Sequence, residues 1–124
     1  MDFKELLAYK KSFQLAMTIF ELSKSFPKEE KYSLTDQIRR SSRSTSANIA
    51  EAYRKRLYPR HFISKLTDSD GENSETDVWL DFALECGYIS TEKHNYLHSE
   101  TVEIGKLINF MIHNPNKFGS NIPK

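Results

Sequence analysis

Prolines and glycines, the residues that interrupt helices, are few in this chain of 124 residues and are widely spaced. Pro27, Pro59, Gly87 and Pro115 divide it into four segments of about 20 to 28 residues, and apolar side chains recur at steps of three and four within each. The pattern predicts helices over residues 3–25, 34–57, 59–86 and 91–113. Because short turns join them, we expect an all-α, up-and-down antiparallel four-helix bundle over residues 1–114 and a flexible tail at 115–124.

The two central helices are unusual, because small polar residues stand at positions that should face the core. The turn near residue 58 makes these helices antiparallel, which brings Ser41 opposite about residue 76 and Asn48 opposite about residue 69. Polar stretches that face each other can satisfy their hydrogen bonds in a buried network that fixes the register. The alternative is a polar patch that faces solvent. We expect the network to include Gln37, Arg40, Ser44, Asn48, Glu51 and Glu75.

The first helix has two apolar stripes on different faces. One comprises Leu6, Tyr9, Phe13, Ala16 and Phe20. The other comprises Leu15, Ile19, Leu22 and Phe26 and begins about 200° around the helix from Phe13. One bundle core cannot bury both faces, so we expect the second stripe to be the contact between subunits of a homo-oligomer. The alternative is a wide core that wraps around this helix.

Charge is balanced over the chain but segregated within it. Residues 33–60 hold seven Lys or Arg and two acidic residues, whereas residues 66–86 hold seven Asp or Glu and no Lys or Arg. The basic helix could bind phosphates, or the two helices could neutralise each other. The net charge of +1 favours neutralisation for most of these residues. The candidate nucleic-acid-binding residues lie beyond most of the acidic run and are Arg54, Lys55, Arg56 and Arg60.

The sequence has no pattern typical of an enzyme. A di-iron bundle needs Glu-x-x-His on two helices, and no glutamate here is followed by histidine three positions later. His94 and His98 lie four residues apart but have no third metal ligand nearby in the sequence. Cys86 has acidic neighbours, which disfavour a thiolate, and we interpret Gly71 as a close backbone contact. We therefore expect no catalytic residue, metal or cofactor, with an unrecognised enzyme as an alternative.

The start of the chain, MDFKELLAYKK, has no apolar run after its charged residues. No later stretch reaches the length of apolar sequence that a transmembrane helix requires. The single cysteine cannot form an internal disulfide bond, which agrees with a reducing compartment. We expect a cytoplasmic protein with no membrane contact.

Two stretches resemble a known family: LTDQIRRSSRSTSANIAEAYRKR at 34–56 and FISKLTDSDGENSETDVWLDFALECGYI at 62–89. They are similar to small four-helix-bundle proteins named for open reading frames in intervening sequences of bacterial 23S ribosomal RNA genes. Ala52, Ser69 and Glu72 depart from the glycine, alanine and serine of the family pattern. The residues that match it are Gln37, Arg39, Arg40, Ser44, Asn48, Ile49, Ala50, Glu51, Leu66, Gly71 and Glu75.

The resemblance implies an up-and-down bundle that assembles as a homopentameric ring. The family includes relatives of the accessory proteins of diversity-generating retroelements, which bind a reverse transcriptase and nucleic acid. No catalytic residues are established for it, and the function of most members is unknown. We expect a non-enzymatic oligomeric scaffold whose basic cluster binds RNA, DNA or a reverse transcriptase. The alternative is an oligomer whose partner is another protein.

Overall fold

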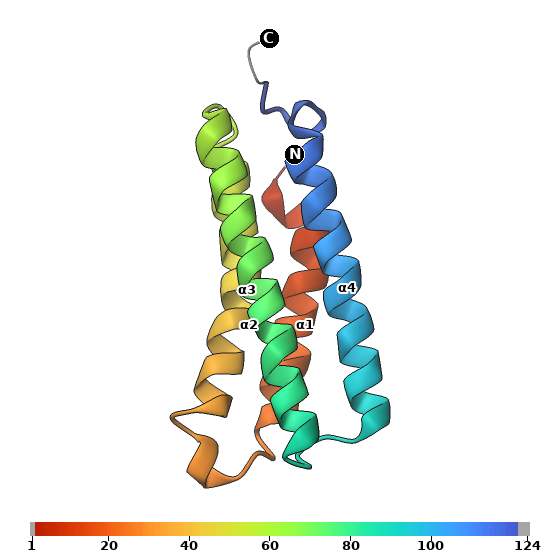
Figure 1. Ribbon diagram of the computed structural model, residues 1–124. Helices are drawn as coiled ribbons and strands as arrows, with labels where there is room; N and C mark the ends of the chain where they lie inside the picture. Colours follow the sequence, from red (N-terminus) through yellow and green to blue (C-terminus); the bar gives the residue numbers. More distant parts are fainter. Residues whose placement is uncertain (1, 122–124) are drawn as a thin grey trace.

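The computed structural model describes residues 2–121 as one bundle of four long helices (Figure 1). The four helices expected from the sequence are present, and residues 2–121 form no strand. None of these helices is both long enough and apolar enough to cross a membrane. In chain order the elements are η1 (Phe3–Glu5), α1 (Leu7–Ser23), η2 (Lys28–Glu30), α2 (Leu34–Arg54), α3 (Pro59–Glu85), α4 (Thr91–His113) and η3 (Pro115–Phe118).

The helix ends follow the backbone chemistry of proline and glycine. Gly87 has φ +76°, a left-handed conformation that glycine adopts at low cost, and the chain leaves α3 just before it. Pro59 disfavours helical geometry at the residue before it, and Tyr58 has φ −117° and ψ 87°. The segment 55–57 is therefore a turn, and α2 ends three residues earlier than the sequence predicted. The first helix likewise begins at Leu7, because Phe3–Glu5 forms a separate 3-10 turn.

Glu30, in the connection before α2, joins three parts of the chain. Its Oε1 accepts hydrogen bonds from Ser33 Oγ at 2.6 Å and from the Leu34 backbone N–H at 3.4 Å. Its Oε2 accepts one from the Tyr88 hydroxyl at 2.8 Å. The bonds from Ser33 and Tyr88 lower the pKa of Glu30, and the bond to Glu30 raises the pKa of Tyr88 to about 12. Glu30 thus holds the start of α2 against the α3–α4 connection.

The core lies between the four helices and contains the stripe that the sequence assigned to subunit contacts. Ile19 is fully buried, Leu15 and Phe26 are also in the core cluster, and Leu22 packs against it. That prediction was wrong, because this stripe is buried inside the single bundle, where α1 contacts both α2 and α4. Phe13, from the other stripe, is 50% exposed. The remaining fully buried large side chains are Ile38, Ile49, Phe62, Leu66, Leu80, Leu97, Ile104, Ile108 and Met111.

The contact between α2 and α3 contains the expected layer of small polar residues. The Ser41 and Thr76 hydroxyls lie 2.8 Å apart, and both side chains are buried. One turn along α2, Ser69 Oγ donates to the Thr45 backbone oxygen at 2.6 Å. Thr76 also donates to the Glu72 backbone oxygen at 2.9 Å. The buried network therefore exists in the predicted register.

The segment that the sequence predicted as a flexible tail folds against the bundle. Pro115 is buried at the start of η3, and Ser120 is fully buried. Gly119 has φ +82°, and a Cβ built on it would lie 3.3 Å from Cδ of Arg56. The last part of the described chain therefore packs beside the turn between α2 and α3. Residues 122–124 of the predicted tail lie outside the described residues.

Candidate nucleic-acid interface

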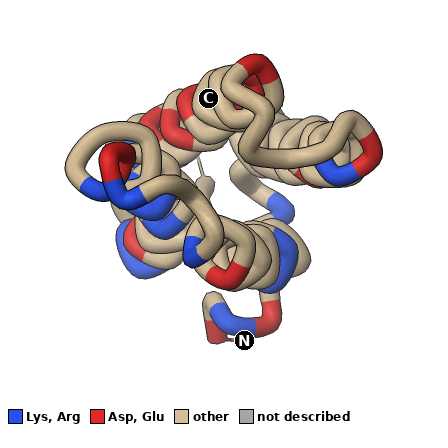
Figure 2. Tube along the Cα trace, turned by 90° about the horizontal axis from the view of Figure 1, so that it is seen from below, with Lys and Arg blue, Asp and Glu red and all other residues tan. Residues whose placement is uncertain are grey.

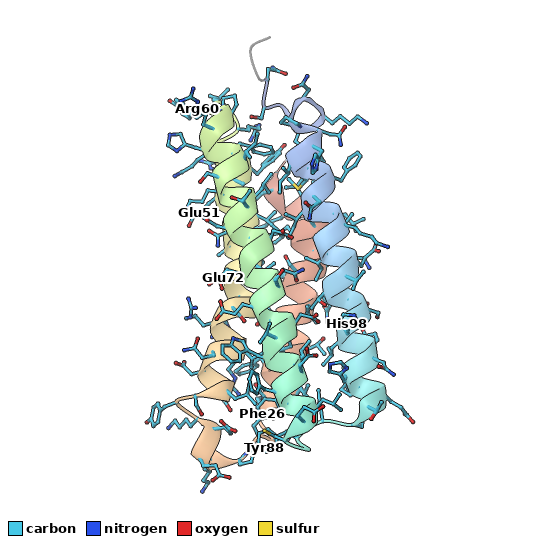
Figure 3. The ribbon with its side chains drawn as sticks, in the orientation of Figure 1. Phe26, Glu51, Arg60, Glu72, Tyr88 and His98 are labelled. Carbon is cyan, nitrogen blue, oxygen red and sulfur yellow. The ribbon has the colours of Figure 1, made fainter. Side chains whose placement is uncertain are left out.

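The predicted basic cluster lies at one end of the bundle. Arg54 is the last residue of α2, and Lys55 and Arg56 follow it in the turn. Arg60 lies in the first turn of α3, at the tip of the bundle in Figure 3. The tight connection between two antiparallel helices therefore gathers four positive charges in a small region.

Three of these four side chains face solvent without an acidic partner. Arg54, Lys55 and Arg60 are exposed, and no carboxylate of residues 2–121 lies within ion-pair distance of their charged nitrogens. Arg56 is held in place: its Nη1 donates to the Tyr53 backbone oxygen at 2.9 Å. The Arg56 guanidinium carbon lies 4.1 Å from the centre of the Tyr53 ring, which is a cation–π contact. The cluster thus combines one fixed cation with three that are free to meet an anion.

The fold adds two lysines that the sequence analysis missed. Lys4 lies in η1, and Lys117 lies in η3 at the same end of the bundle. A depression of about 440 Å³ connects η1 to the cluster and is lined by Asp2, Phe3, Lys4, Tyr53, Arg54 and Arg56. No local sequence pattern marks either lysine, because each is far along the chain from Arg56. We define the basic end as Lys4, Arg54, Lys55, Arg56, Arg60 and Lys117.

The opposite end of the bundle has a different character. Figure 2 views the molecule from that end and shows Lys and Arg interleaved with Asp and Glu along the connection that contains η2. Lys24 there forms an ion pair with Glu21 at 3.1 Å, and η2 itself contains both lysine and glutamate. Positive charge is therefore concentrated at one end of the bundle, whereas positive and negative charges are mixed at the other end.

Further along α2 the cations are engaged by the rest of the bundle. Arg40 Nη2 lies 3.6 Å from Glu75 Oε1, and Arg40 Nη1 lies 4.0 Å from Glu72 Oε1, so α2 and α3 do neutralise each other here. Glu51 on α2 pairs with Lys65 on α3 at 3.0 Å, which raises the pKa of Lys65. The neutralisation alternative therefore holds for this part of the basic helix.

Two other arginines of α2 contact the first helix. Arg39 Nε donates to Ser23 Oγ at 2.7 Å, and its guanidinium carbon lies 4.8 Å from the centre of the Phe20 ring. The Arg43 guanidinium lies 5.4 Å from the same ring. These cations have aromatic and hydroxyl partners rather than carboxylates.

The expected members of the polar network lie around the buried layer rather than within it. Gln37, Ser44 and Asn48 are half-buried, and no hydrogen bond of their side chains occurs within residues 2–121. The buried bonds belong instead to the neighbouring positions Ser41 and Thr45, which point directly at α3. The helical spacing placed Ser41 opposite residue 76 correctly, but Gln37, Ser44 and Asn48, which were chosen for the network, do not bond in this layer. Arg40, Glu51 and Glu75 form the ion pairs described above, at the rim of the contact.

Glu72 has an unfavourable position at this rim. Its Oε2 is buried and accepts no hydrogen bond within the described residues. Burial raises the pKa of Glu72, and the neighbouring Glu75 raises it further, while Arg40 acts in the opposite direction. The folded protein therefore holds the charged form of this carboxyl at a cost.

His94 and His98 on α4 each contact an aspartate on α3. His94 Nε2 lies 2.7 Å from Asp81 Oδ1, and His98 Nδ1 lies 2.9 Å from Asp77 Oδ1. The hydrogen bond to Asp77 raises the pKa of His98. Within residues 2–121 no three or more His, Cys, Asp or Glu side chains are grouped as a metal site. The histidines therefore serve as links between α3 and α4.

Two further residues were singled out in the sequence. Cys86 is exposed as a free thiol after the last residue of α3. Gly71 is exposed, and a Cβ built on it would meet nothing within 4 Å, so the predicted close backbone contact was wrong.

An apolar groove runs between α1 and α2, on the face of α1 that the core does not use. Phe13 is 50% exposed and Met17 is 42% exposed. The groove has a volume of about 350 Å³ and is lined by Phe3, Tyr9, Phe13, Ala16, Met17, Arg43, Ser46, Ala47 and Ala50. Helix α1 therefore does expose apolar surface, but this surface includes Phe13 from the first stripe and not the stripe that was expected to contact another subunit.

Comparison with known proteins gives one family. The family described as "23S rRNA-intervening sequence protein" matches residues 4–110. A crystal structure of a protein with unknown function from the S23 ribosomal protein family of Bacteroides thetaiotaomicron is 32% identical to the chain. The match covers 86% of this chain and 96% of that one, with a TM-score of 0.78. No curated protein matches the chain significantly.

Proposed function

The chain belongs to the 23S rRNA-intervening sequence protein family, and from that premise we propose that it is a non-enzymatic scaffold that binds nucleic acid through its basic end. The observation that supports this is the exposure of Arg54, Lys55 and Arg60 without acidic partners. Releasing counterions from a phosphate backbone favours binding, and Lys and Arg side chains that are not already neutralised gain most from it. A nucleic-acid enzyme such as a reverse transcriptase would be brought to the same complex.

The proposal requires an affinity that depends steeply on salt. Each phosphate neutralised on duplex DNA contributes about −0.9 to the slope of log K against log salt. Sequence preference should be slight, because the basic end is a turn and two helix termini, with no helix presented to a groove. The contacts would position a strand and would not read its bases.

The experiment compares two triple variants with the same change in net charge. The first, Arg54→Gln with Lys55→Gln and Arg60→Gln, removes the three free cations of the basic end. The control, Lys28→Gln with Lys31→Gln and Lys93→Gln, removes three cations at the opposite end. Fluorescence anisotropy of labelled RNA and DNA at two salt concentrations should show weaker binding and a flatter salt slope for the first variant alone. Equal losses in both variants, or no binding by the parent at low salt, would overturn the proposal.

The scaffold part of the proposal concerns self-association through the apolar groove between α1 and α2. Phe13 and Met17 supply exposed apolar surface there, and Arg43 supplies a charge at its edge. A second copy of the chain would bury this surface, and a homopentameric ring would repeat the basic end in each subunit. Weak phosphate contacts would then add through multivalency.

Light scattering tests this association. The parent should have a mass that is a multiple of 14.5 kDa, and near five times that value for a pentamer. Phe13→Glu with Met17→Glu should reduce the mass, whereas Val102→Glu, a similarly exposed position on α4, should not. A monomeric parent, or a reduction caused equally by both variants, would contradict this part of the proposal.

A further inference from the structure

The turn between α2 and α3 exposes two large side chains in the middle of the basic end. Leu57 is 82% exposed and Tyr58 is 64% exposed, with Lys55 on one side and Arg60 on the other. The only aromatic ring near Tyr58 within residues 2–121 is His61, whose centre lies 6.1 Å away with the two rings at 85°. Neither side chain belongs to the core cluster or packs against it, so the stability of the fold gives no reason for these two large residues at the turn.

Hydrogen bonds fix the backbone of Tyr58, and its ring is left uncovered. The Tyr58 backbone N–H donates to the Lys55 oxygen at 2.9 Å, and its oxygen accepts from the Phe62 N–H at 2.9 Å. Pro59 further restricts the conformation of Tyr58. An aromatic side chain on a fixed backbone loses little conformational freedom when a ligand covers it.

A second exposed ring lies at the same end of the bundle. Phe110, in the last turns of α4, is 47% exposed. Lys117 Nζ lies 5.1 Å from its centre, and the Phe118 ring meets it edge-on with centres 6.0 Å apart. The basic end therefore has two exposed rings, each accompanied by cations.

Exposed rings among cations suit unpaired bases. In a duplex the base faces are stacked inside the helix, whereas a single strand can splay its bases onto aromatic side chains while Lys and Arg follow the phosphates. We propose that the ligand of the basic end is single-stranded nucleic acid, with bases stacked on Tyr58 and Phe110. This inference rests on the proposed function and names the class of nucleic acid. An anionic membrane is the other surface that could bind exposed apolar side chains among cations. A single exposed leucine, however, gives little apolar area for insertion into a membrane.

The test measures affinities for three labelled probes of equal length: oligouridine, oligothymidine and a duplex DNA. Tyr58→Ala should weaken binding to the single strands by about 5-fold or more, because stacking on one aromatic ring contributes about that factor or more per base. Binding to the duplex should be unchanged. Tyr58→Phe keeps the ring and should retain the parent affinity. Phe110→Ala should act like Tyr58→Ala, and circular dichroism melting checks that each variant is folded.

The outcomes separate this inference from the proposed function. If the parent binds all three probes equally, and only the loss of charge at the basic end weakens binding, single-strand selectivity is wrong and the proposed function stands. If the parent binds no probe, both are wrong. Binding to phosphatidylserine-containing vesicles that is lost in Leu57→Ala, without binding to any oligonucleotide, would assign the basic end to a membrane surface instead.

Discussion

The Ser41 and Thr76 hydroxyls lie 2.8 Å apart in the buried contact between α2 and α3. Either hydroxyl could donate this bond, because each also lies near a backbone oxygen of its own helix: Thr76 near that of Glu72 and Ser41 near that of Ile38. This contact answers why serine and threonine interrupt the apolar seam of two long helices. Small hydroxyl side chains let the backbones approach, and the bond between them disfavours any other register.

Removing this bond should lower stability by a modest amount. Ser41→Ala and Thr76→Val should each cost about 1 kcal/mol, with a coupling energy of about 0.5 to 1.5 kcal/mol in the double-mutant cycle. Urea denaturation measures the free energies of unfolding. Thr18→Ala is the control, because its hydroxyl bonds to the Gln14 oxygen on the exposed side of α1. Zero coupling would mean that the two hydroxyls act independently.

Two glycines should respond in opposite directions to alanine. Gly71→Ala should raise the free energy of unfolding by about 1 kcal/mol, because the position is inside α3 and the new Cβ meets nothing within 4 Å. Gly87→Ala should lower it by about 1 kcal/mol, because φ is +76° there. Thermal melting of both variants checks the pair. A stabilising Gly87→Ala would contradict the left-handed end of α3.

Neutralising Glu72 should stabilise the protein at neutral pH. Burial and Glu75 raise its pKa in the folded state, so the charged form costs stability above that pKa. Glu72→Gln should increase the free energy of unfolding by a few tenths to about 1 kcal/mol. Glu75→Gln is the comparison and should be destabilising, because Glu75 makes the shorter ion pair with Arg40 and accepts a bond from Trp79. A loss of stability in Glu72→Gln as large as that in Glu75→Gln would refute the prediction.

The contact between His98 and Asp77 should make stability depend on pH. The bond to Asp77, with a smaller attraction from Asp81, raises the folded pKa of His98 above its ordinary value of 6.5. The contact therefore stabilises the folded protein fully below pH 6.5, and this stabilisation is lost as the pH rises through the raised pKa of His98. The melting temperature should fall over this range, and His98→Gln should remove part of the fall. His113→Gln is the comparison variant, because its ring contacts the Asn109 backbone oxygen instead of an aspartate. Identical pH profiles for the parent and His98→Gln would disprove the link.

Helix number and most boundaries were predictable, because proline, glycine and the apolar spacing act locally. The bounds of α4 and the end of α3 at Gly87 are examples. The core face of α1 was not predictable, since both of its stripes have helical spacing. Which stripe is buried depends on where α2 and α4 lie, and the structure buries Ile19 and exposes Phe13. The bonds from Ser33 and Leu34 to Glu30 were not predictable either, because Glu30 is also held by Tyr88, which lies 58 residues away in the sequence.

The candidate site was predictable in part. Arg54, Lys55, Arg56 and Arg60 are close in sequence, so their grouping follows from the turn alone. The contributions of Lys4 and Lys117 depend on how η1 and η3 fold back onto the bundle, which no local pattern reports. The exposure of Tyr58 was equally hidden, because a tyrosine before a helix is as compatible with the core as with solvent.

The fold-back of η3 beside Arg56 has a practical consequence for anyone who attaches a tag or a fusion partner. In an up-and-down bundle of four helices the first and last helices begin and finish at the same end, and here that is the end with Arg54 and Arg60 (Figure 1). A polyhistidine tag or a fluorescent protein joined at either terminus would be attached at the end of the bundle that holds these arginines and would interfere with the proposed binding experiments. An insertion in the α3–α4 connection, around residues 86–90, would place the same label at the opposite end of the molecule.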